Sequence, residues 1–168
     1  MMALWAPGMA CPRSPATRHD EPVEIRRAHV ADAMAVAGVW LRSRAASAPQ
    51  IPPPLHRDDD VHDYFERVVL LEQEVWVAEA NGGVVALLVL DGDWIGQLYV
   101  DPEHCGKGVG SQLIAIAKRE RPDGLKLWTF EANRGARRYY ERHGFVATGS
   151  TLGANEEGAP DVRYEWQP

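Results

Sequence analysis

The chain has few cysteines, no long apolar run and no excess of positive charge. Its two cysteines, Cys11 and Cys105, are too few for a repeated metal-ligand pattern or a secreted disulfide framework. The longest apolar run, Val84 to Leu90, has the length of a strand, whereas a membrane span requires roughly 18 residues. We therefore expect no metal, no membrane segment and a cytoplasmic location.

The net charge of −6 argues against a nucleic-acid partner, because such proteins need a basic surface to displace counterions from phosphates. An anionic ligand would have to be held locally. The length of 168 residues, with 45% apolar and 25% charged residues, suits a single domain of mixed α and β structure. Residues 1–22 contain four prolines and no apolar period, so we expect a disordered extension there and one domain over residues 23–168.

Hydrophobic spacing predicts a strand, two helices and three strands in the first part of this domain. In the first helix, Met34, Ala37 and Leu41 recur at helical spacing. The sequence Asn81-Gly82-Gly83 is typical of a tight hairpin turn. The predicted elements are the strand Val23 to Arg26, the helix Ala31 to Ser47, a helix that starts at Asp58 and has Val61, Phe65, Val68 and Val69 on one face, and the strands Glu74 to Ala80, Val84 to Leu90 and Trp94 to Val100.

A glycine-rich loop follows the last of these strands. Gly106, Gly108 and Gly110 alternate where a helix with an apolar side begins. Alternate glycines let the backbone approach a ligand without Cβ clashes, and a helix start leaves N–H groups unpaired beside a partial positive charge. The combination favours phosphate binding, although the glycines could also only tighten a turn. Neither the P-loop pattern nor G-x-G-x-x-G is met.

Two sequence blocks together resemble one protein family. The segment LYVDPEHCGKGVGSQLI, residues 98–114, resembles the cofactor-binding segment of the GNAT superfamily of acetyl-CoA-dependent N-acetyltransferases. The segment NRGARRYYERHGF, residues 133–145, resembles the later helix and strand of that superfamily. The resemblance covers residue 23 to the C-terminus. It implies an α+β fold, mixed α/β in three layers, with a central, mostly antiparallel, splayed sheet flanked by helices.

The resemblance also implies a site for acetyl-CoA as the acetyl donor. By position, Leu98, Tyr99 and Val100 bind the pantetheine arm, and the Val100 N–H faces the thioester oxygen as it becomes negative. Asn133 is a cofactor contact or, equally, the N-cap of the helix Arg134 to Arg142. The loop residues that take the pyrophosphate are Cys105, Gly106, Lys107, Gly108, Val109, Gly110 and Ser111, with Cys105 at a position where the family usually has Arg or Gln.

Tyr140 matches the tyrosine that protonates the departing CoA thiolate in the family, with a plain core tyrosine as the alternative. The implied reaction is direct attack by a primary amine of a small molecule or peptide in a ternary complex. A lysine-like amine has a pKa near 10.4, so supplying its neutral form at pH 7 costs about 4.6 kcal/mol. Candidate bases, acting directly or through water, are Glu79, Asp93 and Glu131, and candidate receivers of a cationic amine are Asn155, Glu156 and Glu157.

Two other functions stay open at this point. A non-catalytic acyl-CoA sensor needs the same loop, and Cys105 together with the unassigned base favours it. A nucleotide-dependent oxidoreductase could use Glu131, at the end of the predicted strand Leu125 to Phe130, as a ribose-binding acid. The antiparallel hairpin at Asn81 argues against that function. The amine acceptor is the expected partner, and a homodimer is left open.

Overall fold

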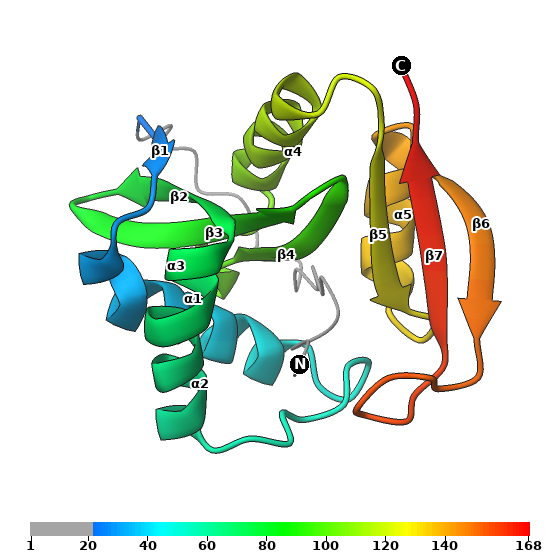
Figure 1. The fold of residues 1–168 in the computed structure, drawn as a ribbon, viewed down its shortest axis with the longest axis horizontal. Coiled ribbons are helices and arrows are strands. Elements are labelled where there is room, and N and C mark those ends of the chain that lie inside the picture. Colours follow the sequence, from blue (N-terminus) through cyan, green and yellow to red (C-terminus); the bar gives the residue numbers. More distant parts are fainter. Residues whose placement is uncertain (1–21) are drawn as a thin grey trace.

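The computed structural model describes residues 22–168, which form one seven-stranded sheet with helices on both faces (Figure 1). The strand order is β1-β2-β3-β4-β5-β7-β6, and every neighbouring pair is antiparallel except the parallel pair of β4 and β5. The predicted α+β fold with a mostly antiparallel sheet is thereby confirmed. The predicted disordered extension lies, apart from Pro22, outside the described residues.

Several elements have the bounds that the sequence predicts, namely β2, β4, β5 and α5. None of the helices in residues 22–168 is long and apolar enough to cross a bilayer. The strands are β1 (Glu24–Arg27), β2 (Glu74–Ala80), β3 (Gly83–Asp91), β4 (Trp94–Val100), β5 (Leu125–Phe130), β6 (Val146–Thr151) and β7 (Asp161–Trp166). The helices are α1 (Ala33–Ala46), α2 (Asp58–Tyr64), α3 (Leu70–Glu72), α4 (Val109–Glu120) and α5 (Arg134–Arg142), with 3-10 turns η1 (Val30–Asp32) and η3 (Pro102–His104) and the π-helical segment η2 (Phe65–Val69).

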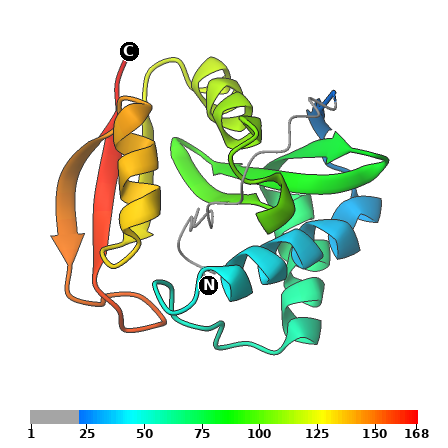
Figure 2. The same ribbon diagram turned by 180° about the vertical axis from the view of Figure 1, so that it is seen from behind.

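The helices form the two outer layers. α1 and α2 cover one face of the sheet, and α4 and α5 cover the other (Figure 1, Figure 2). Strand β3 contributes to both cores because its side chains alternate: Leu87 and Val89 belong to the core under α1, whereas Leu88 and Leu90 belong to the core under α4. All four side chains are at most 1% exposed. This double burial accounts for the uninterrupted apolar run in the sequence.

The buried face of α1 differs from the predicted one. Met34 is 69% exposed, whereas Val36, Ala37 and Trp40 are buried. The Trp40 ring packs edge-on against Tyr99 at 6.0 Å, and its indole N–H donates to Gln97 at 3.2 Å. Apolar residues occur nearly all around α1, so spacing alone does not identify the inner face; the largest side chain and its hydrogen bond decide the orientation.

Strands β4 and β5 meet at one end only. Their single register pair within residues 22–168 joins Trp94 and Lys126, and the Lys126 N–H also donates to the Asp93 carbonyl at 2.9 Å. Beyond this pair the two strands diverge toward their C-terminal ends, Val100 and Phe130 (Figure 1). Because the strands run parallel, both ends lie at the same edge of the sheet. The sheet therefore opens at that edge.

Candidate functional site

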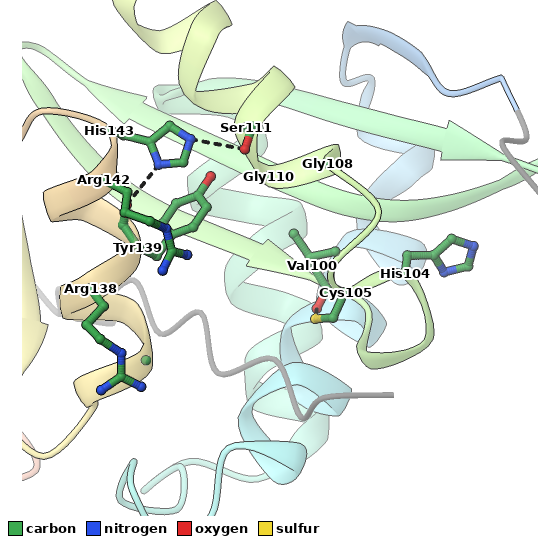
Figure 3. Close-up of a pocket in the computed structure, with 12 residues that line it drawn as sticks. Val100, His104, Cys105, Gly108, Gly110, Ser111, Arg138, Tyr139, Arg142 and His143 are labelled. Carbon is green, nitrogen blue, oxygen red and sulfur yellow. Dashed lines mark hydrogen bonds between the residues drawn. The ribbon is translucent and has the colours of Figure 1, made fainter. Parts of the chain in front are cut away.

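A cavity of about 400 Å³ lies where β4 ends, between the start of α4 and one face of α5 (Figure 3). Four segments contribute to it: the end of β4, the glycine loop, the first turn of α4, and α5 with the residue after it. No carboxylate lines this cavity. The lining residues are Val100, His104, Cys105, Gly106, Gly108, Gly110, Ser111, Gly135, Arg138, Tyr139, Arg142 and His143.

The glycine loop adopts a backbone conformation that requires glycine at two positions. Gly106 and Gly108 have φ angles of 77° and 81°, in the left-handed region. A Cβ at either position would meet nothing within 4 Å, so conformation, not crowding, demands glycine. Gly108 is the N-cap of α4, and its carbonyl accepts from the Gln112 N–H at 3.1 Å. The N–H groups of the first turn have no acceptor within the helix, and Gly110 and Ser111 of this turn line the cavity.

The buried carboxylate of Asp101 holds the start of this loop. One carboxylate oxygen accepts from the Glu103 N–H at 3.1 Å, and the other forms an ion pair with Arg42 of α1 at 2.7 Å. The Asp101 N–H donates to the Val85 carbonyl of β3 at 2.8 Å. The loop is thus anchored both to strand β3 and to helix α1, which covers the opposite face of the sheet from α4. The sequence reasoning missed this residue, because its partner lies 59 positions away.

Helix α5 starts with a side-chain cap. The Asn133 side-chain oxygen accepts from the Ala136 N–H at 3.1 Å, which confirms the capping role. The side-chain nitrogen of Asn133 is buried and has no hydrogen-bond partner in residues 22–168. A buried donor in that state costs stability unless a ligand accepts from it. The cofactor contact of Asn133 stays a prediction. Its side-chain nitrogen is the atom that is available to make it.

Two consecutive tyrosines of α5 are buried in different ways. Tyr139 lines the cavity, whereas Tyr140 is fully buried against Phe145, at 5.7 Å between ring centroids. Burial raises the pKa of both hydroxyls, well above 10 for Tyr140. Neither hydroxyl forms a hydrogen bond within the described part of the chain. The hydroxyl of Tyr140 therefore stays protonated at physiological pH.

A histidine joins α5 to α4 beside the cavity. The Nδ1 atom of His143 lies 2.8 Å from the Tyr139 carbonyl oxygen, and its Nε2 atom lies 3.0 Å from the Ser111 Oγ (Figure 3). A carbonyl oxygen only accepts, so Nδ1 carries a proton. In the neutral ring, Nε2 then accepts from the Ser111 hydroxyl. This contact joins two residues of the cavity lining, one from each helix end.

The structure brings six of the predicted cofactor-binding residues together around the cavity and leaves the others out of its lining. Leu98, Tyr99 and Val109 are buried in the two cores, and Lys107 is exposed. Asn133, the N-cap of α5, and Tyr140, within α5, are both buried and outside the lining. The six lining residues are Val100, Cys105, Gly106, Gly108, Gly110 and Ser111.

Cys105 itself is disulfide-bonded, a pairing that the sequence analysis did not assign. The chain's other cysteine, Cys11, lies outside the described residues.

One face of α5 was missing from the predicted site. Gly135, Arg138, Tyr139 and Arg142 all line the cavity, and their spacing of three and four residues places them on one helical face. The sequence does contain a signal for this face: Arg138 and Arg142 are four residues apart on the predicted helix, so two charged side chains share one helical face. The sequence analysis left Tyr139 out of the site, whereas the structure places it both in the core and at the cavity.

A second cavity, of about 420 Å³, lies at the end of β5. It combines the segment between α1 and α2, the end of β5, the first part of α5 and the loop before β7. The proline-rich segment between the helices therefore forms one wall of this cavity, and its prolines restrict the backbone there because each fixes its own φ angle. The lining residues are Pro49, Gln50, Pro52, Phe130, Glu131, Ala132, Arg134, Arg137, Ala159 and Pro160.

The three candidate bases lie at different places in the sheet. Asp93 forms an ion pair with Lys126 at 2.7 Å, which lowers the pKa of this carboxyl, at the closed end of the β4–β5 pair. This position excludes Asp93. Glu79 forms an ion pair with Arg26 at 2.6 Å on β2. Glu131, which lines the second cavity at the open end, is the candidate that the geometry favours.

A buried ion pair connects α1 to the loop before β7. Arg44 and Glu157 are 3.0 Å apart, with side chains 1% and 8% exposed. Arg44 also donates to the Pro52 carbonyl at 2.9 Å, and its guanidinium lies 5.8 Å from the Phe130 ring centroid. The sequence analysis suggested Glu157 as a receiver of the amine. The structure argues against this role, because the Glu157 carboxylate is buried in the ion pair with Arg44. Asn155 is likewise engaged, with Asp161 at 3.0 Å.

Comparisons with known proteins agree on one family. The family model of the acetyltransferase (GNAT) domain matches residues 72–147. An N-acetyltransferase of Archaeoglobus fulgidus is 30% identical over 100 residues, which are 50% of this chain and 68% of the relative. The peptidyl-lysine N-acetyltransferase YjaB of Salmonella typhimurium is 28% identical over 76% of this chain and 86% of the relative. An N-acetyltransferase of Methanocaldococcus jannaschii is 30% identical, and the match spans 43% of its length.

Solved structures share the fold. The solution structure of YjaB from Escherichia coli has a TM-score of 0.71 at 24% identity, and the match covers 86% of this chain and 97% of that one. An acetyltransferase of Bacillus anthracis, solved in complex with acetyl coenzyme A, has a TM-score of 0.52 at 25% identity over 57% of this chain and 62% of that one. The family model, the similar N-acetyltransferases and the shared fold lead to one conclusion: the chain belongs to the GNAT family of acetyltransferases.

Proposed function

We propose that the protein transfers an acetyl group from acetyl-CoA to a primary amine by direct attack in a ternary complex. The observation that carries this proposal is the cavity at the open end of the β4–β5 pair, where the glycine loop and the first turn of α4 face α5. The start of a helix offers N–H groups and a partial positive charge to an anion. The strand end at Val100 lies beside these groups, so one ligand can contact both.

Acetyl-CoA is the donor, and the cavity has the chemistry that its diphosphate needs. The backbone amides of the loop and of α4 supply donors, and the absence of a carboxylate in the lining avoids repulsion. The left-handed glycines at 106 and 108 keep the loop surface free of side chains. A bound diphosphate would thus meet amide hydrogens directly.

The reacting end of the donor would lie beside β4. The Asp101 N–H donates to β3, so strand alternation turns the Val100 N–H toward β5. In that direction it would stabilise the negative charge that develops on the thioester oxygen. Tyr140, the acid that the resemblance implies, would supply a proton to the departing CoA thiolate, which requires the thiolate to reach a fully buried hydroxyl behind the cavity lining. Asn133 would donate its side-chain N–H to the cofactor.

The acceptor amine would enter through the second cavity. The two cavities are lined by Val100 and Phe130, the ends of the two diverging strands, so an amine in the second cavity approaches a thioester held at the first. Glu131 would remove its proton, directly or through a water molecule. Because YjaB is a peptidyl-lysine N-acetyltransferase, we propose the ε-amine of a lysine in a peptide as the first acceptor to test, with small-molecule amines as the second.

Turnover distinguishes this function from its rivals. The experiment measures release of free CoA thiol from acetyl-CoA in the presence of lysine peptides, amino acids, polyamines and aminoglycosides. Thiol release that depends on an amine supports the proposal. Acetyl-CoA binding by calorimetry without turnover on any amine would support the acyl-CoA sensor instead, and binding of NAD in place of CoA would support an oxidoreductase. A cytoplasmic location remains an expectation from composition.

A further inference from the structure

The second cavity contains more positive than negative charge. Among the described residues that line it, Arg134 and Arg137 are cationic and Glu131 is the single acid. The first turn of α5, residues 134–137, reads Arg-Gly-Ala-Arg. The start of a helix has a partial positive charge that favours anions, so two arginines in this turn are unfavourable for the helix by itself. Helix stability therefore does not explain why they are there.

The two arginines differ in how far the protein itself engages them. Arg137 donates from its Nε atom to the Tyr164 hydroxyl at 3.2 Å and from a terminal nitrogen to the Glu131 carbonyl at 3.4 Å. The Arg134 side chain is exposed and forms no hydrogen bond or ion pair with another residue in 22–168. Its guanidinium N–H groups can thus bind a ligand in the cavity without breaking a contact within the described chain.

This excess of positive charge bears on which acceptor the cavity accommodates. An acceptor amine arrives largely as an ammonium ion, which Glu131 attracts and the two arginines repel. Each further ammonium group of a polyamine would meet more repulsion, because the lining offers it no second carboxylate. A carboxylate on the acceptor would instead be attracted by the arginines while the amine reaches Glu131. The lining therefore fits an acceptor that carries charges of both signs.

We propose that the acceptor carries a carboxylate a few bonds from its reactive amine, and that Arg134 binds this carboxylate with Arg137 as a second cation. This inference rests on the proposed function, because it assumes that the acceptor occupies the second cavity. The planar guanidinium group matches the two oxygens of a carboxylate with paired N–H donors. Arg134 is then a specificity-determining residue that takes no part in proton transfer.

The carboxylate can come from two sources, the free carboxyl group of an amino acid or an acidic side chain beside a lysine in a peptide. Two sets of acceptors separate them. The first set pairs short unbranched ω-amino acids with their amides. The second set pairs a peptide that has Glu on both sides of one lysine with the same peptide carrying Gln. In at least one set, the wild-type protein should show a kcat/KM about fivefold higher for the carboxylate member, through a lower KM.

Substitution of Arg134 tests the residue itself. Arg134→Gln should reduce this preference to about one, by raising the KM of the carboxylate acceptor about fivefold, and leave kcat and the KM for acetyl-CoA unchanged. Glutamine keeps the helix propensity, so the variant should fold. Arg134→Lys keeps the charge without the paired donors and should retain part of the preference. In the control, Arg67→Gln, the preference should stay intact, because the Arg67 side chain is 74% exposed and lines neither cavity.

The possible failures are distinguishable. Turnover of amines without a preference in either set, or an equal loss on both members of a pair in Arg134→Gln, would overturn the inference while the proposed function stands. A higher kcat/KM for polyamines than for every carboxylate acceptor would do the same. A wild-type protein that acetylates no amine in either set, and no polyamine, would overturn both.

Discussion

The hydroxyl of Tyr140 is buried without a hydrogen-bond partner in residues 22–168, an arrangement that costs free energy of folding. Tyr164, whose ring centroid lies 6.4 Å from that of Tyr140, is the opposite case. Its hydroxyl donates to Glu141 and accepts from Arg137. Two neighbouring tyrosines thus differ in whether the protein itself uses the hydroxyl, which allows a functional role to be separated from a structural one.

Changing each of these tyrosines to Phe should have opposite effects. Tyr140→Phe should lower kcat about 100-fold or more by removing the acid, with acetyl-CoA affinity and stability unchanged or slightly higher. Tyr164→Phe should lower the unfolding free energy by about 1 kcal/mol, because it strands two partners, and keep most of the rate. Steady-state kinetics and urea unfolding of both variants check this. An undiminished rate in Tyr140→Phe would remove that residue from the chemistry.

The same burial predicts a loss of stability at high pH. Burial raises the pKa of Tyr140 well above 10 in the folded protein, whereas an unfolded tyrosine ionises near 10. Above pH 10 the unfolded chain therefore releases a proton that the folded chain keeps, and folding weakens by up to about 1.4 kcal/mol per pH unit. Urea unfolding at pH 9 and pH 11 should show a smaller loss in Tyr140→Phe than in wild type. Equal losses would contradict the assignment.

At the scale of elements, local patterns predicted far more than long-range contacts. The bounds of β4, β5 and α5 follow from alternation and capping within the elements themselves. The inner face of α1 does not, because Trp40 finds its hydrogen bond with Gln97 57 positions away. The Arg44–Glu157 pair spans 113 positions. No spacing rule reaches that far, so the loops that shape the second cavity could not be assembled from the sequence.

Glu157→Gln should destabilise the protein by about 3 to 5 kcal/mol, because it leaves the Arg44 charge buried without its partner. The pair connects α1 with the loop before β7, so this variant should also raise the KM for the acceptor more than that for acetyl-CoA. Glu72→Gln on α3 is the control: Glu72 is exposed and lines neither cavity, so both properties should barely change. Denaturant unfolding and kinetics decide, and equal effects of the two changes would refute the role of the buried pair.

At the scale of the whole molecule, the sheet consists of two parts with a narrow junction. Strands β1 to β4 and strands β5 to β7 share the Trp94–Lys126 register pair at one end, and the Arg44–Glu157 ion pair connects α1 with the β7 side at the other. The lining of the first cavity comes from both parts, because α4 packs on β3 and β4, whereas α5 follows β5. A ligand in that cavity would therefore connect the two parts.

Hydrogen exchange with and without acetyl-CoA tests this connection. At about 100 times its Kd, the ligand should raise the unfolding free energy by about 2.7 kcal/mol. Amide exchange should slow both in the first turn of α4 and in α5, and hardly change in β1. The double variant Arg138→Gln, Arg142→Gln changes two lining residues of α5, so it should keep the protection at α4 and lose much of it at α5. Protection confined to residues 105–111 in the wild-type protein would mean that the ligand is held by the β1–β4 part alone and does not connect the two parts.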